Sequence, residues 1–109
     1  MAESPIVAEV TPPSGVTILL YANQAGQTSS GTVFITNHAG VGRTDTVGVA
    51  LVPNGQSLSD ASYICRNTTV EASYTVYLQQ IYLGDQDRIY VVSQNGTSNF
   101  VFTGTIWSI

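Results

Sequence analysis

At 109 residues the chain is long enough for one hydrophobic core, and 43% of its residues are hydrophobic while only 9% are charged. It has no lysine, three arginines and a net charge of −4, so it lacks the clustered cations that bind nucleic acid or an anionic membrane. The one cysteine excludes an internal disulfide, and the N-terminus lacks the basic and apolar segments of a secretion signal. We therefore expect synthesis in a reducing cytoplasm.

The N-terminal segment, residues 1–15, holds three of the four prolines. Pro12 and Pro13 cannot donate backbone hydrogen bonds and favour an extended conformation. We predict an extended N-terminal arm over residues 1–15, with a short edge strand over residues 6–10, followed by a β-domain over residues 16–109. Two interpretations of the arm stay open: a frayed tail, or a segment that docks on a neighbouring subunit.

Three strands are predicted in the first half of the β-domain. Residues 16–21, 32–36 and 46–52 alternate side chains between two faces, as strands with one face on a core do. In the first of them the alternation directs Tyr21 away from the core. Residues 53–55, Pro-Asn-Gly, form a strong turn signal after the third strand.

Three further strands are predicted between residues 73 and 107. Leu83-Gly84-Asp85 and Gln94-Asn95-Gly96 separate three alternating runs, which predict three consecutive antiparallel strands that form one sheet. The apolar phase changes from even to odd positions within the first run. A β-bulge at Gln79 and Gln80 would produce that change.

With a further short strand near residues 63–65, the pattern predicts an all-β fold of seven or eight strands and no helix of ordinary length. We expect a two-sheet antiparallel β-sandwich of jelly-roll or immunoglobulin-like topology. Large apolar residues also occur on faces directed away from the core, where tyrosine and tryptophan are typical of interfaces. They predict a homo-oligomer, preferably a trimer, or a docking surface; the alternative is a monomer with scattered surface apolar residues. The candidate interface residues are Pro12, Pro13, Tyr21, Tyr77, Tyr90, Val101 and Trp107.

Residues with catalytic or ligating chemistry are few. His38 is the single histidine and ends a predicted strand, and Cys65 is interpreted as a buried structural cysteine. Asp85 is expected to accept backbone hydrogen bonds in a turn, and Asp87 to face Arg88 or solvent. The residues around these two acids do not follow a calcium-loop pattern. We expect no enzyme activity, no catalytic residue, no metal and no cofactor.

Six short motifs mark strand ends and turns between residues 18 and 105. They are LY at 20–21, ITN at 35–37, VGVALVPNG at 47–55, LGD at 83–85, RIYV at 88–91 and FVFTG at 100–104. In these motifs the chain resembles small β-sandwich virion structural proteins of tailed bacteriophages. The resemblance implies a structural component of the virion, made in the host cytoplasm: a capsid decoration (cement) protein, or a neck, tail or fibre accessory. It implies other virion proteins as partners and no catalysis.

A carbohydrate-binding, lectin-like module of a receptor-binding or tail-fibre assembly is the alternative hypothesis. The polar segment 24–31, together with tyrosine or tryptophan platforms, would supply sugar contacts. A small enzyme is a third hypothesis, for which the residues offer no constellation.

Overall fold

The computed structural model describes residues 2–108, which contain eight strands and one short 3-10 helix, η1 (Asp60–Ser62). The strands are β1 (Ala2–Val10), β2 (Ile18–Ala22), β3 (Gln27–Asn37), β4 (Asp45–Val52), β5 (Tyr63–Val70), β6 (Thr75–Leu83), β7 (Arg88–Ser93) and β8 (Ser98–Ser108). Residues 1 and 109, the outer ends of the predicted arm and domain, lie outside the described residues. The predicted all-β sandwich is confirmed.

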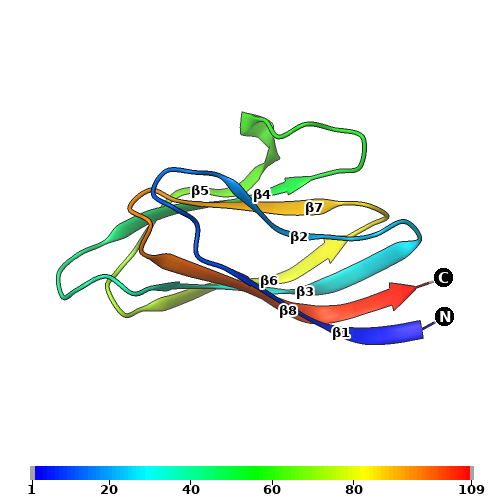
Figure 1. The fold of residues 1–109 in the computed structure, drawn as a ribbon, viewed down its shortest axis with the longest axis horizontal. Helices are drawn as coiled ribbons and strands as arrows, with labels where there is room; N and C mark the ends of the chain where they lie inside the picture. The colour runs from blue at the N-terminus through cyan, green and yellow to red at the C-terminus, as the bar shows by residue number, and fades with distance from the viewer. Residues whose placement is uncertain (1, 109) are drawn as a thin grey trace.

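The strands form two antiparallel sheets of four, ordered β1-β8-β3-β6 and β2-β7-β4-β5. Figure 1 shows them as two layers with both chain ends at the same end of the molecule. β1 pairs with β8, β2 with β7, β3 with β6 and β4 with β5, as if one long hairpin had been folded at the β4–β5 connection and rolled up. The β3–β8 and β4–β7 pairings complete the two sheets. This strand order is that of an eight-stranded jelly roll.

The three strands β6, β7 and β8 do not form one sheet, so that part of the sequence prediction is wrong. β6 and β8 flank β3 in one layer, and β7 lies in the other. The segments 84–87 and 94–97 therefore cross between layers instead of closing hairpins. Alternation in the sequence indicates which face of a strand each side chain lies on. It does not indicate which strand will pair with it, because pairing uses backbone N–H and C=O groups that all residues except proline carry alike.

β1 is longer than the short edge strand that was expected over residues 6–10. It pairs with β8 in continuous register from Ala2 opposite Ser108 to Val10 opposite Phe100. Ile6 is buried in the core, and Ala8 packs against the same cluster. β1 is therefore an edge strand of the sandwich, and docking of the N-terminal segment on a neighbouring subunit stays a prediction.

The core lies between the two layers. Val33 and Ile35 of β3 and Phe100 and Phe102 of β8 are fully buried in one sheet. Their counterparts in the other sheet are Val47, Val49, Ile89 and Val91. Burial of this many branched and aromatic side chains, at about 25 cal/mol per Å² of apolar surface, is the main stabilising term of the fold.

Two of the register shifts between paired strands decide which side chains of β6 and β2 enter the core. The bulge predicted near Gln79 is present: the β3–β6 register shifts there, and Gln80 has φ of 58°. A second bulge, between Leu19 and Tyr21, was not predicted. It turns Tyr21 inward, where its ring lies 5.3 Å from that of Phe102, so the expected outward orientation of Tyr21 is wrong.

Candidate binding surfaces

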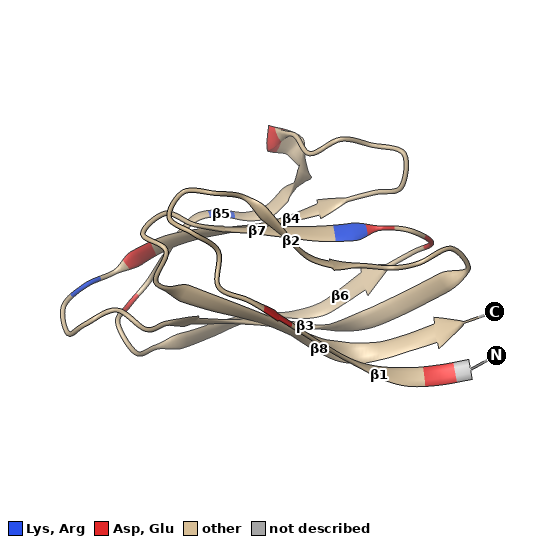
Figure 2. Ribbon diagram, viewed as in Figure 1, with Lys and Arg blue, Asp and Glu red and all other residues tan. Residues whose placement is uncertain are grey.

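The two sheets present different outer sides. β3, β6 and β8 contain no charged residue, and β1 contributes only Glu3 and Glu9. Figure 2 shows the remaining charges in loops, near strand ends or on the other sheet. A broad sheet surface whose only charged groups lie on its edge strand β1 costs little to desolvate and is therefore suited to protein contact.

Large apolar and aromatic side chains lie on the outer side of sheet β1-β8-β3-β6. The antiparallel register places Glu9, Val101, Phe34 and Tyr77 in one row across all four strands. The Phe34 and Tyr77 rings are 6.0 Å apart. We call this outer side the open face. Threonines also lie on it, and its large side chains are Val7, Phe34, Tyr77, Tyr82, Val101 and Trp107.

The open face is exposed in the single chain. Val7 is 79% exposed, Tyr82 71%, Tyr77 56% and Phe34 38%, while Val101 and Trp107 are half-buried. Monomeric proteins rarely leave a contiguous apolar area uncovered on one sheet. This face is therefore the best candidate on the described chain for contact with another polypeptide.

The outer side of sheet β2-β7-β4-β5 is partly covered by the chain itself. The segment between β4 and β5, with η1, lies over it (Figure 1). Arg88 donates to the carbonyl oxygens of Pro53 and Gln56, which ties that segment to β7. Outward-facing Ala50, Val52 and Val92 are buried as a result, whereas Leu19 stays exposed.

The seven predicted interface residues are not all brought together. Tyr77, Val101 and Trp107 share the open face. Tyr90 lies on the opposite sheet with the Arg88 guanidinium 5.9 Å above its ring, and Tyr21 faces the core. Pro12 is buried and Pro13 exposed in the connection between β1 and β2.

Three members of the open face were missed. Phe34 alternates with buried Val33 and Ile35, so its outward direction could be derived from the strand pattern. Tyr82 follows the Gln80 bulge, and Val7 lies in the short edge strand expected within the arm, for which no partner strand was predicted. Placing these two residues on the open face required knowledge of which strands pair.

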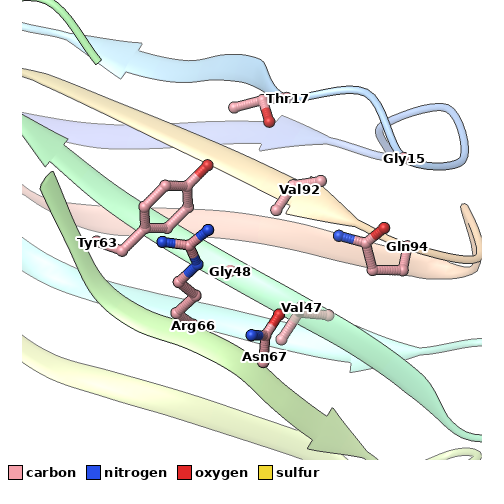
Figure 3. A pocket seen from close by; sticks show the side chains of 9 residues that line it. All are labelled: Gly15, Thr17, Val47, Gly48, Tyr63, Arg66, Asn67, Val92 and Gln94. Carbon is pink, nitrogen blue, oxygen red and sulfur yellow. The ribbon is translucent and has the colours of Figure 1, made fainter. Parts of the chain in front are cut away.

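A small pocket of about 120 Å³ lies on the outer side of sheet β2-β7-β4-β5. Figure 3 shows the side chains around it. It is lined by Gly15, Thr17, Val47, Gly48, Tyr63, Arg66, Asn67, Val92 and Gln94. Sequence reasoning did not find it, because these residues come from separate strands and loops.

The Arg66 side chain is positioned by two contacts. Its guanidinium carbon lies 5.1 Å from the centre of the Tyr63 ring, and one of its nitrogens lies 3.0 Å from a carboxylate oxygen of Asp60 in η1. Gly48 lies below that ring: a Cβ there would come within 3.1 Å of the Tyr63 ring and 3.0 Å of Val92. Glycine at position 48 thus lets Tyr63 lie close to the sheet.

A second cavity, of about 410 Å³, lies at one end of the sandwich. Ala39, Arg43, Thr44, Asn95 and Thr97 line it. Asn95 donates to the carbonyl oxygen of Thr44, which joins the β7–β8 and β3–β4 loops beside it.

The segment 24–31, which was expected to be a sugar-binding loop, is mostly strand. Its residues 27–31 belong to β3, which leaves only a tight turn at Gly26.

The residues singled out for chemistry lie apart. His38 is exposed, and half-buried Cys65 packs against the core with Thr68 Oγ1 3.0 Å from its Sγ. Asp85 accepts from the backbone N–H of Gly26, as expected of a turn aspartate.

Asp87 does not face Arg88 or solvent as predicted. It accepts from the backbone N–H groups of Gly84 and Asn54, because the β4–β5 loop lies next to the β6–β7 turn.

Within residues 2–108, no group of three or more His, Cys, Asp or Glu residues could hold a metal ion. None of the described helices has the length and apolar character required to cross a membrane.

No protein-family model matches the chain, and no curated protein matches it in sequence. Among solved structures, it is similar to a chain of the T13 IBDV viral particle, with a TM-score of 0.59 and 9% identity over 95% of this chain. It is also similar to a chain of the capsid of Ralstonia phage GP4, with a TM-score of 0.51 and 12% identity over 99% of this chain. The chain spans 30% of the length of the IBDV chain and 86% of the GP4 chain. At these identities the similarity shows a shared fold.

Proposed function

We propose that the chain is a bacteriophage virion structural protein, a capsid decoration (cement) protein or a neck or tail accessory, which acts through contacts with other virion subunits. The observation that carries this proposal is the open face of sheet β1-β8-β3-β6. It combines exposed aromatic side chains with the absence of charge on three of its four strands. Burial of the β8, β3 and β6 part of this face releases water from apolar surface without the cost of desolvating ions.

The two similar structures support the same role. The GP4 chain is only slightly longer than this one, since 99% of this chain covers 86% of it. A single jelly roll of this size therefore occurs within a structure of a phage capsid. The IBDV chain contains the fold as one part of a longer polypeptide in a viral particle.

Self-association into a trimer is part of the proposal. A specific interface needs roughly 1,000 Å² or more of buried surface. A face that spans four paired strands of up to 11 residues has room for contacts of that kind.

A Tyr77→Arg substitution tests the proposed docking face. Tyr77 is 56% exposed on the open face, beside Phe34, so an arginine there would be buried without a partner at an interface. Particles of the encoding virus assembled with this variant should carry at least tenfold less of the protein than wild-type particles do. Quantitative mass spectrometry of purified particles measures the ratio.

Tyr74→Arg is the matched control, because Tyr74 is 66% exposed but lies outside β6, in its connection with β5. It should leave incorporation unchanged, and circular dichroism should show both variants folded. Absence of the wild-type protein from purified particles would contradict the virion role. Equal incorporation of both variants would contradict docking through the open face.

The carbohydrate-binding alternative is favoured by a different observation, the polar pocket on the other sheet. Its lining contains an arginine, two amide side chains and two hydroxyl groups. That pocket carries the inference developed next.

A further inference from the structure

We propose that the pocket formed by Thr17, Gly48, Tyr63, Arg66, Asn67 and Gln94 binds the carboxylate-bearing end of an acidic sugar. The proposal does not rest on the virion role, because the pocket and the open face belong to opposite sheets. A virion protein seated through the open face would direct this pocket towards the solution. The two functions are therefore compatible and separately testable.

The charge of the pocket favours a carboxylate. Arg66 is the only formally charged residue among those that line it. Phosphate sites combine several cations, or a cation with a helix N-terminus, whereas a planar guanidinium matches one carboxylate through two parallel N–H donors. Asp60 forms an ion pair with a single Arg66 nitrogen, which leaves the other N–H donors of the guanidinium for a ligand.

The position of Arg66 is prepared before a ligand arrives. The stacking contact with Tyr63 and the ion pair with Asp60 restrict a side chain that would otherwise sample many rotamers. Prior restriction reduces the entropy lost on binding. The backbone below is also constrained, since Asn67 has φ of 52° in the left-handed region, where non-glycine residues often mark functional positions.

The rest of the lining suits the hydroxyl groups of a sugar ring. The amides of Asn67 and Gln94 and the hydroxyl groups of Thr17 and Tyr63 each donate and accept hydrogen bonds, as sugar hydroxyls do. The volume of about 120 Å³ is below the roughly 300–1,000 Å³ of sites that enclose a drug-sized ligand. The carboxylate end would enter the pocket, and the ring would lie at its mouth.

Titration of the ¹⁵N-labelled chain with glucuronate, and separately with N-acetylneuraminate, tests the proposal by NMR. Glucose is the neutral counterpart of glucuronate, and inorganic phosphate tests for a general anion site. At least one acidic sugar should give saturable shifts at the amides of Gly48, Asn67 and Gln94, with glucose and phosphate at least tenfold weaker. Arg66→Gln should weaken this binding at least tenfold while leaving the melting temperature nearly unchanged, because the side chain is half exposed.

Arg43→Gln is the matched control, since it removes the same charge from the other cavity. It should bind as the wild type does. An acidic glycan array gives a second readout that is more sensitive through multivalency. The proposal would be overturned if acidic and neutral sugars gave equal shifts, or if phosphate bound more tightly than the acidic sugars. It would also be overturned if Arg43→Gln abolished binding and Arg66→Gln did not, or if neither assay gave a response. None of these outcomes bears on incorporation into particles.

Discussion

At the scale of single residues, Asp45 is a buried acid held by hydrogen bonds from several segments. Its carboxylate is buried and accepts hydrogen bonds from the hydroxyls of Ser93 and Ser98 and the backbone N–H groups of Thr46 and Asn95. Burial by itself would raise the pKa of this carboxyl, but these hydrogen bonds outweigh burial and hold the pKa below its usual range. The network joins the start of β4 to the end of β7 and the start of β8.

Asp45→Asn should destabilise the fold by about 3 kcal/mol. An amide has one accepting oxygen where the carboxylate has two, and its NH₂ group would face hydroxyl and N–H groups that are themselves donors. Urea denaturation at neutral pH measures the change. Asp60→Asn is the control and should have little effect, since Asp60 is 88% exposed. A similar loss of unfolding free energy in both variants would show that the buried hydrogen-bond network of Asp45 is not the cause of the destabilisation.

The same carboxylate predicts a pH dependence. A pKa that is lower in the folded than in the unfolded state contributes stability above the unfolded value of about 3.9, and this contribution is lost as the pH falls through the folded pKa. The difference in unfolding free energy between wild type and Asp45→Asn should therefore narrow below about pH 4. Denaturation curves between pH 7 and pH 2 check this, and a constant difference would contradict it.

At the scale of elements, β3 and β8 approach each other unusually closely at Gly31 and Gly104. These residues face each other across the strand pair. A Cβ on Gly31 would overlap the carbonyl oxygen of Thr103, and one on Gly104 would overlap that of Ser30. The absence of side chains lets the central strands of this sheet pair at that point.

Gly31→Ala should therefore destabilise the chain by roughly 3 kcal/mol, because backbone atoms of two central strands would have to move apart. Gly40→Ala is the control: a Cβ at position 40 would meet no atom within 4 Å, and its φ is not positive. Thermal denaturation of both variants measures the contrast. Equal melting temperatures would show that the strands can separate at little cost.

At the scale of the whole molecule, the two outer sides of the sandwich are unequal. The sheet β1-β8-β3-β6 is open and almost uncharged, while the other is partly covered by the β4–β5 segment and holds the Arg66 pocket. This asymmetry suits a protein that joins an assembly through one side and leaves the other towards the solution.

Trp107→Ala should weaken self-association more than folding. Trp107 is half-buried on the open face, opposite Glu3 in β1 and Thr28 in β3, so most of its remaining surface is available to a partner. Light scattering after size exclusion measures the oligomer, and urea denaturation measures stability. Leu19→Ala, on the opposite sheet, should leave the oligomer intact. A wild-type chain that stays monomeric at high concentration would contradict self-association, and parallel losses of stability and assembly would assign Trp107 to the core.

Sequence alone was sufficient for the fold class, most of the strands and the bulge near Gln79. All of these depend on alternation or composition within a few residues. The tertiary structure decided the partner of each strand, the inward turn of Tyr21, the membership of the open face and the existence of the Arg66 pocket. The physical reason is that period two assigns a side chain to a face, while strand pairing uses backbone groups that every residue shares. Which faces meet, and which stay uncovered, is therefore settled only when distant segments pack together.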